Sequence, residues 1–109
     1  MDDIDLEKYY EEERKVCFIT NQIIRNIEGL GETKISNAHR EHLCDMIVDG
    51  IEGLVGKYLS AQAASNSSFR KFIREALKSI SDKLFSLIIN LNFVDGRLLD
   101  AYDDINNIL

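Results

Sequence analysis

The clearest hydrophobic pattern in the chain lies between Asn66 and Leu91. Apolar residues recur there at spacings of three and four positions: Phe69, Ile73, Ala76, Ile80, Leu84, Leu87 and Leu91. This spacing places the apolar side chains on one face of an α-helix. Asn66, Ser67 and Ser68 offer side-chain oxygens that can cap its first turn. The pattern therefore predicts a helix over residues 67–91.

Similar spacing predicts three further helices, over about residues 3–28, 36–63 and 96–108. Runs of Val, Ile and Thr alternating with polar residues, which are typical of strands, are missing, and the chain has no proline and six glycines. A length of 109 residues fits one domain, and 45% hydrophobic residues can supply a core. We expect a single all-α domain over residues 1–109, a four-helix bundle with short connections.

Three glycines interrupt the second predicted helix at every third position, Gly50, Gly53 and Gly56. Each costs about 1 kcal/mol relative to alanine in a helix interior, so their presence calls for an explanation. Gly50 falls on the apolar face of this helix. The pattern allows a close helix crossing at Gly50, a kink between Asp49 and Gly56, or close approach of a ligand.

Net charge and local composition restrict the partner and the compartment. The net charge of -6 argues against a general nucleic-acid binder, because phosphate binding relies on clustered Lys and Arg. The first residues are acidic, where a secretory signal would be basic and then apolar. The most apolar run, residues 84–94, is too short and too polar to cross a bilayer. We expect a cytoplasmic protein without membrane contact, with Cys17 and Cys44 as buried free thiols.

Residues with catalytic or metal-binding potential are few. His39 and His42 could share a helix face with Asp45, but their spacing matches no zinc motif. Nucleophile, phosphate-loop and dinucleotide motifs are missing as well. We therefore expect no catalytic residues, no metal site, no cofactor and no enzymatic activity.

Charge patterning on the second predicted helix is more informative. Acidic residues recur there at helical spacing, opposite the apolar face and without interspersed lysine: Glu41, Asp45, Asp49 and Glu52. A solvated surface explains such a stripe, and so does a docking face for a basic protein partner. For the docking face we expect Phe18 and Tyr10 to act as aromatic anchors. A small, acidic, helical protein without catalytic groups has the physical profile of inhibitors, immunity proteins and secretion chaperones.

Some apolar residues fall outside the main stripes of their helices, namely Phe18, Ile19, Phe85 and Ile89. Because a monomer of this size cannot easily cover all of them, they favour an alternative hypothesis. In this hypothesis the protein is a self-associating structural or adaptor module, and a symmetric homodimer buries these residues. We accordingly expect a homo-oligomer. A third hypothesis is nucleic-acid regulation through a basic strip on the third helix: Arg70, Lys71, Arg74 and Lys78. It ranks last because these four cations oppose the overall negative charge.

Overall fold

The described residues form four helices and no strand. The computed structural model describes the backbone of residues 3–90 and 95–109 and the side chains of residues 10–90 and 95–109. The helices are α1 (Asp3–Leu30), α2 (Asn37–Ala63), α3 (Ser67–Asn90) and α4 (Gly96–Ile108). The expected all-α, four-helix architecture is confirmed. The expected end of the third helix at Leu91 lies outside the described residues.

Polar side chains cap three of the helix starts. Ser36, Asn66 and Asp95 accept hydrogen bonds from backbone N–H groups in the first turns of α2, α3 and α4. These bonds satisfy donors that have no partner within the helix. Between α2 and α3 the chain turns at Ser65, whose φ of 57° lies in the left-handed region that ends many helices. The α1–α2 and α2–α3 connections are therefore short.

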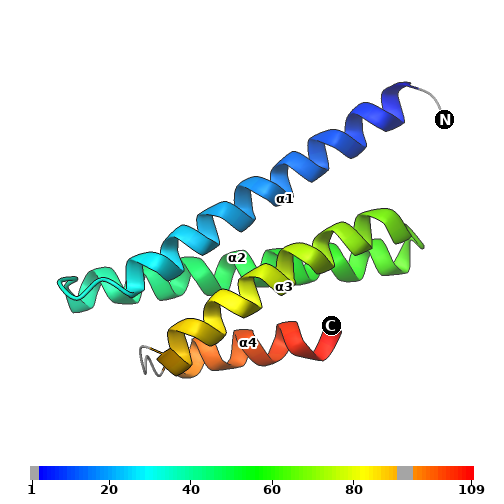
Figure 1. Ribbon diagram of the computed structural model, residues 1–109. Coiled ribbons are helices and arrows are strands. Elements are labelled where there is room, and N and C mark those ends of the chain that lie inside the picture. Colours follow the sequence, from blue (N-terminus) through cyan, green and yellow to red (C-terminus); the bar gives the residue numbers. More distant parts are fainter. Residues whose placement is uncertain (1–2, 91–94) are drawn as a thin grey trace.

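Helices α2 and α3 form the central pair of the fold (Figure 1). Both α1 and α4 pack against this pair, but within the described residues α1 and α4 do not contact each other. Figure 1 shows the first half of α1 diverging from the other helices, and the molecule is elongated, with extents of 51 × 24 × 18 Å. The outer surfaces of α1 and α4 consequently lie on opposite sides of the central pair.

The core consists of the apolar faces of all four helices. Its buried members are Val16, Ile23, Ile27, Leu30, Leu43, Cys44, Ile47, Ile51, Leu54, Tyr58, Ile73, Leu77, Ile80, Leu84, Leu87, Leu98, Ala101 and Ile105. Leu77 lies outside the stripe predicted for α3 but is fully buried, because α3 packs against three other helices and needs a wider apolar surface. Cys44 is buried as expected. Cys17 is exposed, and that expectation is wrong because the preceding Val16 takes the core-facing position.

Helix α2 is continuous through all three of its glycines. A Cβ atom at Gly50 would lie 2.7 Å from Cγ1 and 2.8 Å from Cδ1 of Ile23 in α1, well inside the usual carbon–carbon separation of about 3.5–4.0 Å. At Gly53 and Gly56 a Cβ atom would have no neighbour within 4 Å. Gly50 therefore marks a close crossing of α1 and α2, and α2 is not broken between Asp49 and Gly56.

Candidate protein-docking site

The acidic residues of the predicted stripe all have exposed side chains and lie along the side of α2 that adjoins α4. Helix α4 contributes carboxylates of its own to this side, and a shallow groove between the two helices is lined by Val48, Glu52, Arg97, Asp100, Ala101, Asp103 and Asp104. We define the acidic edge as the seven carboxylates Glu41, Asp45, Asp49, Glu52, Asp100, Asp103 and Asp104. It is a larger acidic surface than the stripe on α2 alone.

One end of the acidic edge is neutralised by Arg97 of α4. Its Nη1 atom lies 2.6 Å from Asp45 Oδ1, and its Nη2 atom lies 2.9 Å from Glu41 Oε2. Nη2 also lies 3.1 Å from the capping carboxylate of Asp95. The hydrogen bonds between Arg97 and Asp95 raise the pKa of the guanidinium and lower the pKa of the carboxyl group. The stripe is therefore not free of cations at this end.

Sequence reasoning missed Arg97 because it lies 52 positions from Asp45 and on another helix. The pattern within α2 shows only the carboxylates and not the cation that α4 brings to them. One sequence signal was present, since Arg97 is the single basic residue within an acidic helix. An isolated cation of this kind is a candidate for an ion pair with a neighbouring helix.

The other end of the acidic edge is not neutralised. Partial burial between α2 and α4, together with a hydrogen bond and charge repulsion from Asp104, raises the pKa of Glu52. Among the described residues, no Lys or Arg nitrogen lies within 4.0 Å of the carboxylates of Asp49, Asp100 or Asp103. This end therefore combines closely spaced carboxyl groups with uncompensated negative charge.

The Glu52–Asp104 contact predicts a specific pH dependence of stability. Because the pKa of Glu52 is raised on folding, its unfavourable contribution is present above the folded-state pKa and is lost as pH falls towards the ordinary value of 4.5. Glu52→Gln should raise the melting temperature at neutral pH, and the difference from the wild type should shrink on acidification. Thermal denaturation at a series of pH values from neutral down to about 4.5 measures the difference in melting temperature between the two proteins. Asp103→Asn, which removes the same charge without this contact, is the matched control, and a difference independent of pH would contradict the expectation.

The predicted aromatic anchors lie on α1. Tyr10 is 52% exposed and Phe18 is 65% exposed. Phe18 lies beside Lys57 of α2 and Ile19 of its own helix, and Ile19 is half-buried near Gly50. Because α1 and α4 are not in contact in the described part of the chain, these anchors lie apart from the α4 carboxylates of the acidic edge.

The remaining residues of the expected oligomer interface lie on α3. Phe85 is 51% exposed and Ile89 is 59% exposed, and the centroid of the Phe85 ring lies 6.4 Å from that of Tyr102 in α4. The four residues expected at one interface therefore fall into two groups. Phe18 and Ile19 lie on α1, and Phe85 and Ile89 lie beside α4.

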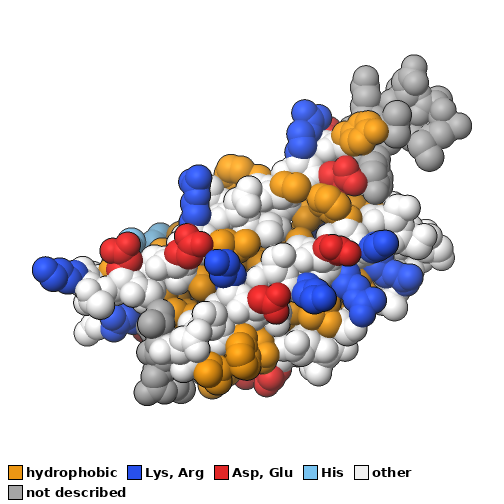
Figure 2. Space-filling view, viewed as in Figure 1, with side chains coloured by type: hydrophobic (Ala, Val, Ile, Leu, Met, Phe, Trp, Pro, Cys, Tyr) orange, Lys and Arg blue, Asp and Glu red, His pale blue; other side chains and the backbone are white. Residues whose placement is uncertain are grey.

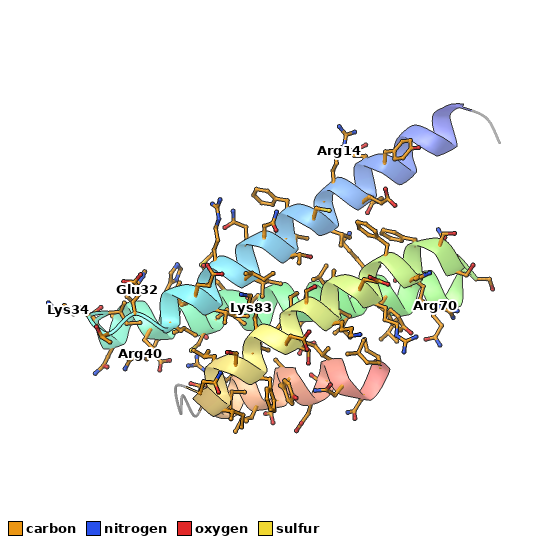
Figure 3. The ribbon with its side chains drawn as sticks, in the orientation of Figure 1. Arg14, Glu32, Lys34, Arg40, Arg70 and Lys83 are labelled. Carbon is orange, nitrogen blue, oxygen red and sulfur yellow. The ribbon has the colours of Figure 1, made fainter. Side chains whose placement is uncertain are left out.

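The basic strip lies over the first half of α3, where Figure 2 shows basic side chains gathered. Arg70, labelled in Figure 3, is half-buried, and the other three side chains are exposed. Arg74 donates a hydrogen bond of 2.7 Å from Nη2 to the backbone oxygen of Leu109. Among the described residues, no Asp or Glu side-chain oxygen lies within 4.0 Å of any cation of the strip.

The two histidines lie near the start of α2. His39 and His42 are both exposed. In the part of the chain that the structure describes, no group of three or more His, Cys, Asp or Glu side chains is placed to hold a metal ion. The histidines therefore do not add a cluster of ligands to the acidic edge.

Comparison of the chain with protein-family models, curated proteins and solved structures gives no significant match. Within the described ranges, none of the helices has a stretch both long and apolar enough to cross a membrane.

Proposed function

We propose that this protein is a non-enzymatic protein-binding module that docks a basic partner on its acidic edge. The observation that carries the proposal is the groove between α2 and α4, where Glu52 of α2 and Asp104 of α4 line the same hollow together with Asp100 and Asp103. No Lys or Arg nitrogen lies within 4.0 Å of the carboxyl groups of Glu52 or Asp104 in the described residues. A lysine or arginine from a partner would relieve the repulsion between these two groups and would form charge-assisted hydrogen bonds.

The groove between α2 and α4 suits a cationic side chain. Val48 and Ala101 supply apolar surface for its aliphatic stem, and Glu52, Asp100 and Asp104 supply carboxylates for its charged end. Arg97 binds carboxylates of α2 in the same manner within the fold. The net charge of -6 adds a field that attracts a basic protein and speeds its encounter with the acidic edge. Inhibitors, immunity proteins and chaperones are the classes of protein that act through such docking alone.

A capture experiment with matched variants tests this proposal. The wild-type protein, Asp49→Lys/Asp100→Lys and Lys71→Glu/Lys78→Glu would each be immobilised and exposed to lysate of the source cell. Bound proteins would be quantified by mass spectrometry. Asp45 is left unchanged because it pairs with Arg97, and its replacement would also loosen α4.

We expect basic proteins to be retained by the wild type and by the Lys71/Lys78 variant but lost from the Asp49/Asp100 variant. Equal retention by all three proteins would contradict a docking role of the acidic edge. Loss from the Lys71/Lys78 variant alone would instead favour the basic strip of α3 and the nucleic-acid hypothesis.

A further inference from the structure

The outer face of α1 carries aromatic and arginine side chains in alternation. Tyr10, Arg14, Phe18 and Arg25 follow at spacings that place them on one helix face, and all four are exposed. Figure 2 shows basic and hydrophobic side chains alternating along this edge, and Figure 3 shows Arg14 directed away from the bundle. We call these four residues the α1 ridge.

The α1 ridge is suited to a protein contact by the types of its residues. Phe18 is 65% exposed, the largest exposed fraction among the large apolar side chains of the described residues. No carboxylate oxygen lies within 4.0 Å of Arg14 or Arg25 among the described side chains. Aromatic residues and arginine are the types that dominate binding energy at protein interfaces. A surface complementary to this ridge would combine apolar residues with carboxylates.

A surface of that composition is present on the opposite side of the same molecule. Phe85 and Ile89 of α3 lie one helical turn apart, and Phe85 packs against Tyr102 of α4. Leu99, one turn before Tyr102, is 37% exposed. We call these four residues the α3–α4 patch.

Two carboxylates flank the α3–α4 patch. Asp82 precedes Phe85 by one turn of α3, and Asp103 follows Leu99 by one turn of α4. Both are exposed, and no Lys or Arg nitrogen of the described residues lies within 4.0 Å of either one. The patch therefore has an apolar centre with Asp82 and Asp103 beside it and the exposed Lys78 one turn beyond Asp82, whereas the α1 ridge alternates aromatic and basic side chains.

We propose that the α1 ridge of one copy docks onto the α3–α4 patch of a second copy, head to tail. Charge complementarity selects this occupant, because the unpaired charges nearest the aromatic side chains are arginines on the ridge and Asp82 and Asp103 on the patch. The acidic neighbours of the ridge, Glu11 and Glu28, are already paired with Lys15 and Lys83. The ridge lies on α1 and the patch lies where α3 adjoins α4, and α1 and α4 are not in contact among the described residues, so a single copy can use both surfaces at once. This self-association goes beyond the proposed function, because its apolar contacts involve side chains outside the acidic edge.

A head-to-tail contact differs physically from a symmetric dimer. In a symmetric dimer the same surface pairs with itself, and association stops at two copies. When two different surfaces pair, each added copy leaves one of each free, so the assembly grows with concentration unless it closes into a ring. The apolar centre should maintain association at about 0.15 M salt, where the Debye length is about 8 Å and the flanking charges are partly screened.

Analytical ultracentrifugation of three variants tests the pairing. Phe18→Glu damages only the α1 ridge, and Phe85→Glu damages only the α3–α4 patch. Leu59→Glu is the matched control, since Leu59 is 48% exposed on α2 and belongs to neither surface. Circular dichroism would establish that each variant remains helical. The masses would be measured from micromolar to millimolar concentration, for each protein alone and for an equimolar mixture of the two Phe variants.

We expect the wild type and Leu59→Glu to grow in mass with concentration and each Phe variant alone to remain monomeric. The mixture should form a heterodimer and stop there, because it combines one intact ridge with one intact patch. If only one Phe variant loses self-association, a symmetric contact replaces the head-to-tail one. A wild type that stays monomeric at every concentration would exclude a second copy as the occupant.

Discussion

Replacing Gly50 with leucine should lower the free energy of unfolding by about 2–3 kcal/mol, because overpacking a close helix crossing forces side chains or backbone to move. A Cβ atom alone would lie 2.7 Å from Ile23 Cγ1, and leucine adds three further carbons. Leucine's higher helix propensity offsets only part of this cost, about 1 kcal/mol relative to glycine. Urea denaturation followed by circular dichroism measures the change.

The other two glycines of α2 supply the control for this prediction. Gly53→Ala and Gly56→Ala should each raise the free energy of unfolding by up to about 1 kcal/mol, because neither added methyl group meets a neighbour. If Gly50→Leu is tolerated as well as these two substitutions, α1 and α2 do not cross closely at Gly50.

Truncation of Leu98 to alanine should lower the free energy of unfolding by about 2–5 kcal/mol, the range found for Leu→Ala substitutions in well-packed cores. Leu98 is fully buried in the first turn of the short helix α4, and only Ala101 and Ile105 accompany it in the core. Its loss should therefore loosen the helix that carries Arg97 and three of the seven carboxylates of the acidic edge.

The neighbouring residue offers a matched control for Leu98→Ala. Leu99 is 37% exposed, so Leu99→Ala removes the same atoms from a partly solvated position and should cost less than half as much. Urea denaturation of both variants measures the difference. Equal losses of stability would mean that α4 is not held to the bundle by its Leu98 face.

The architecture could be predicted from the sequence because its determinants are local. The apolar spacing in residues 67–91 predicts a helix, and the Asp95 cap predicts where the next helix begins. Such features depend on residues within one or two turns of each other, so no knowledge of the neighbouring helices is needed. The place of Gly50 on an apolar face left a helix crossing, a kink and a ligand contact open, and the neighbouring Ile23 of α1 and the continuity of α2 decide for the crossing.

The arrangement of the candidate site could not be predicted, because it depends on how helices distant in sequence are paired and rotated. The ion pairs of Arg97 with α2 and the contact of Glu52 with Asp104 arise only when α4 lies beside α2. The separation of Phe18 from Phe85 likewise depends on how α3 is rotated, because Phe85 lies against Tyr102 of α4, and α4 does not contact α1 among the described residues. Helical periodicity shows which face of each helix is polar but not which polar faces adjoin one another.

The rate at which the captured basic partner associates with the acidic edge tests the central claim most directly. Stopped-flow kinetics would compare the wild type with the Asp49→Lys/Asp100→Lys and Lys71→Glu/Lys78→Glu variants. At low ionic strength we expect the Asp49/Asp100 reversal to slow association on the order of tenfold, since exposed charges at an interface act mainly on the association rate. The difference should shrink above about 0.1 M salt, where the Debye length falls below about 10 Å. An association rate that is unchanged by the Asp49/Asp100 reversal but reduced by the Lys71/Lys78 reversal would contradict the claim.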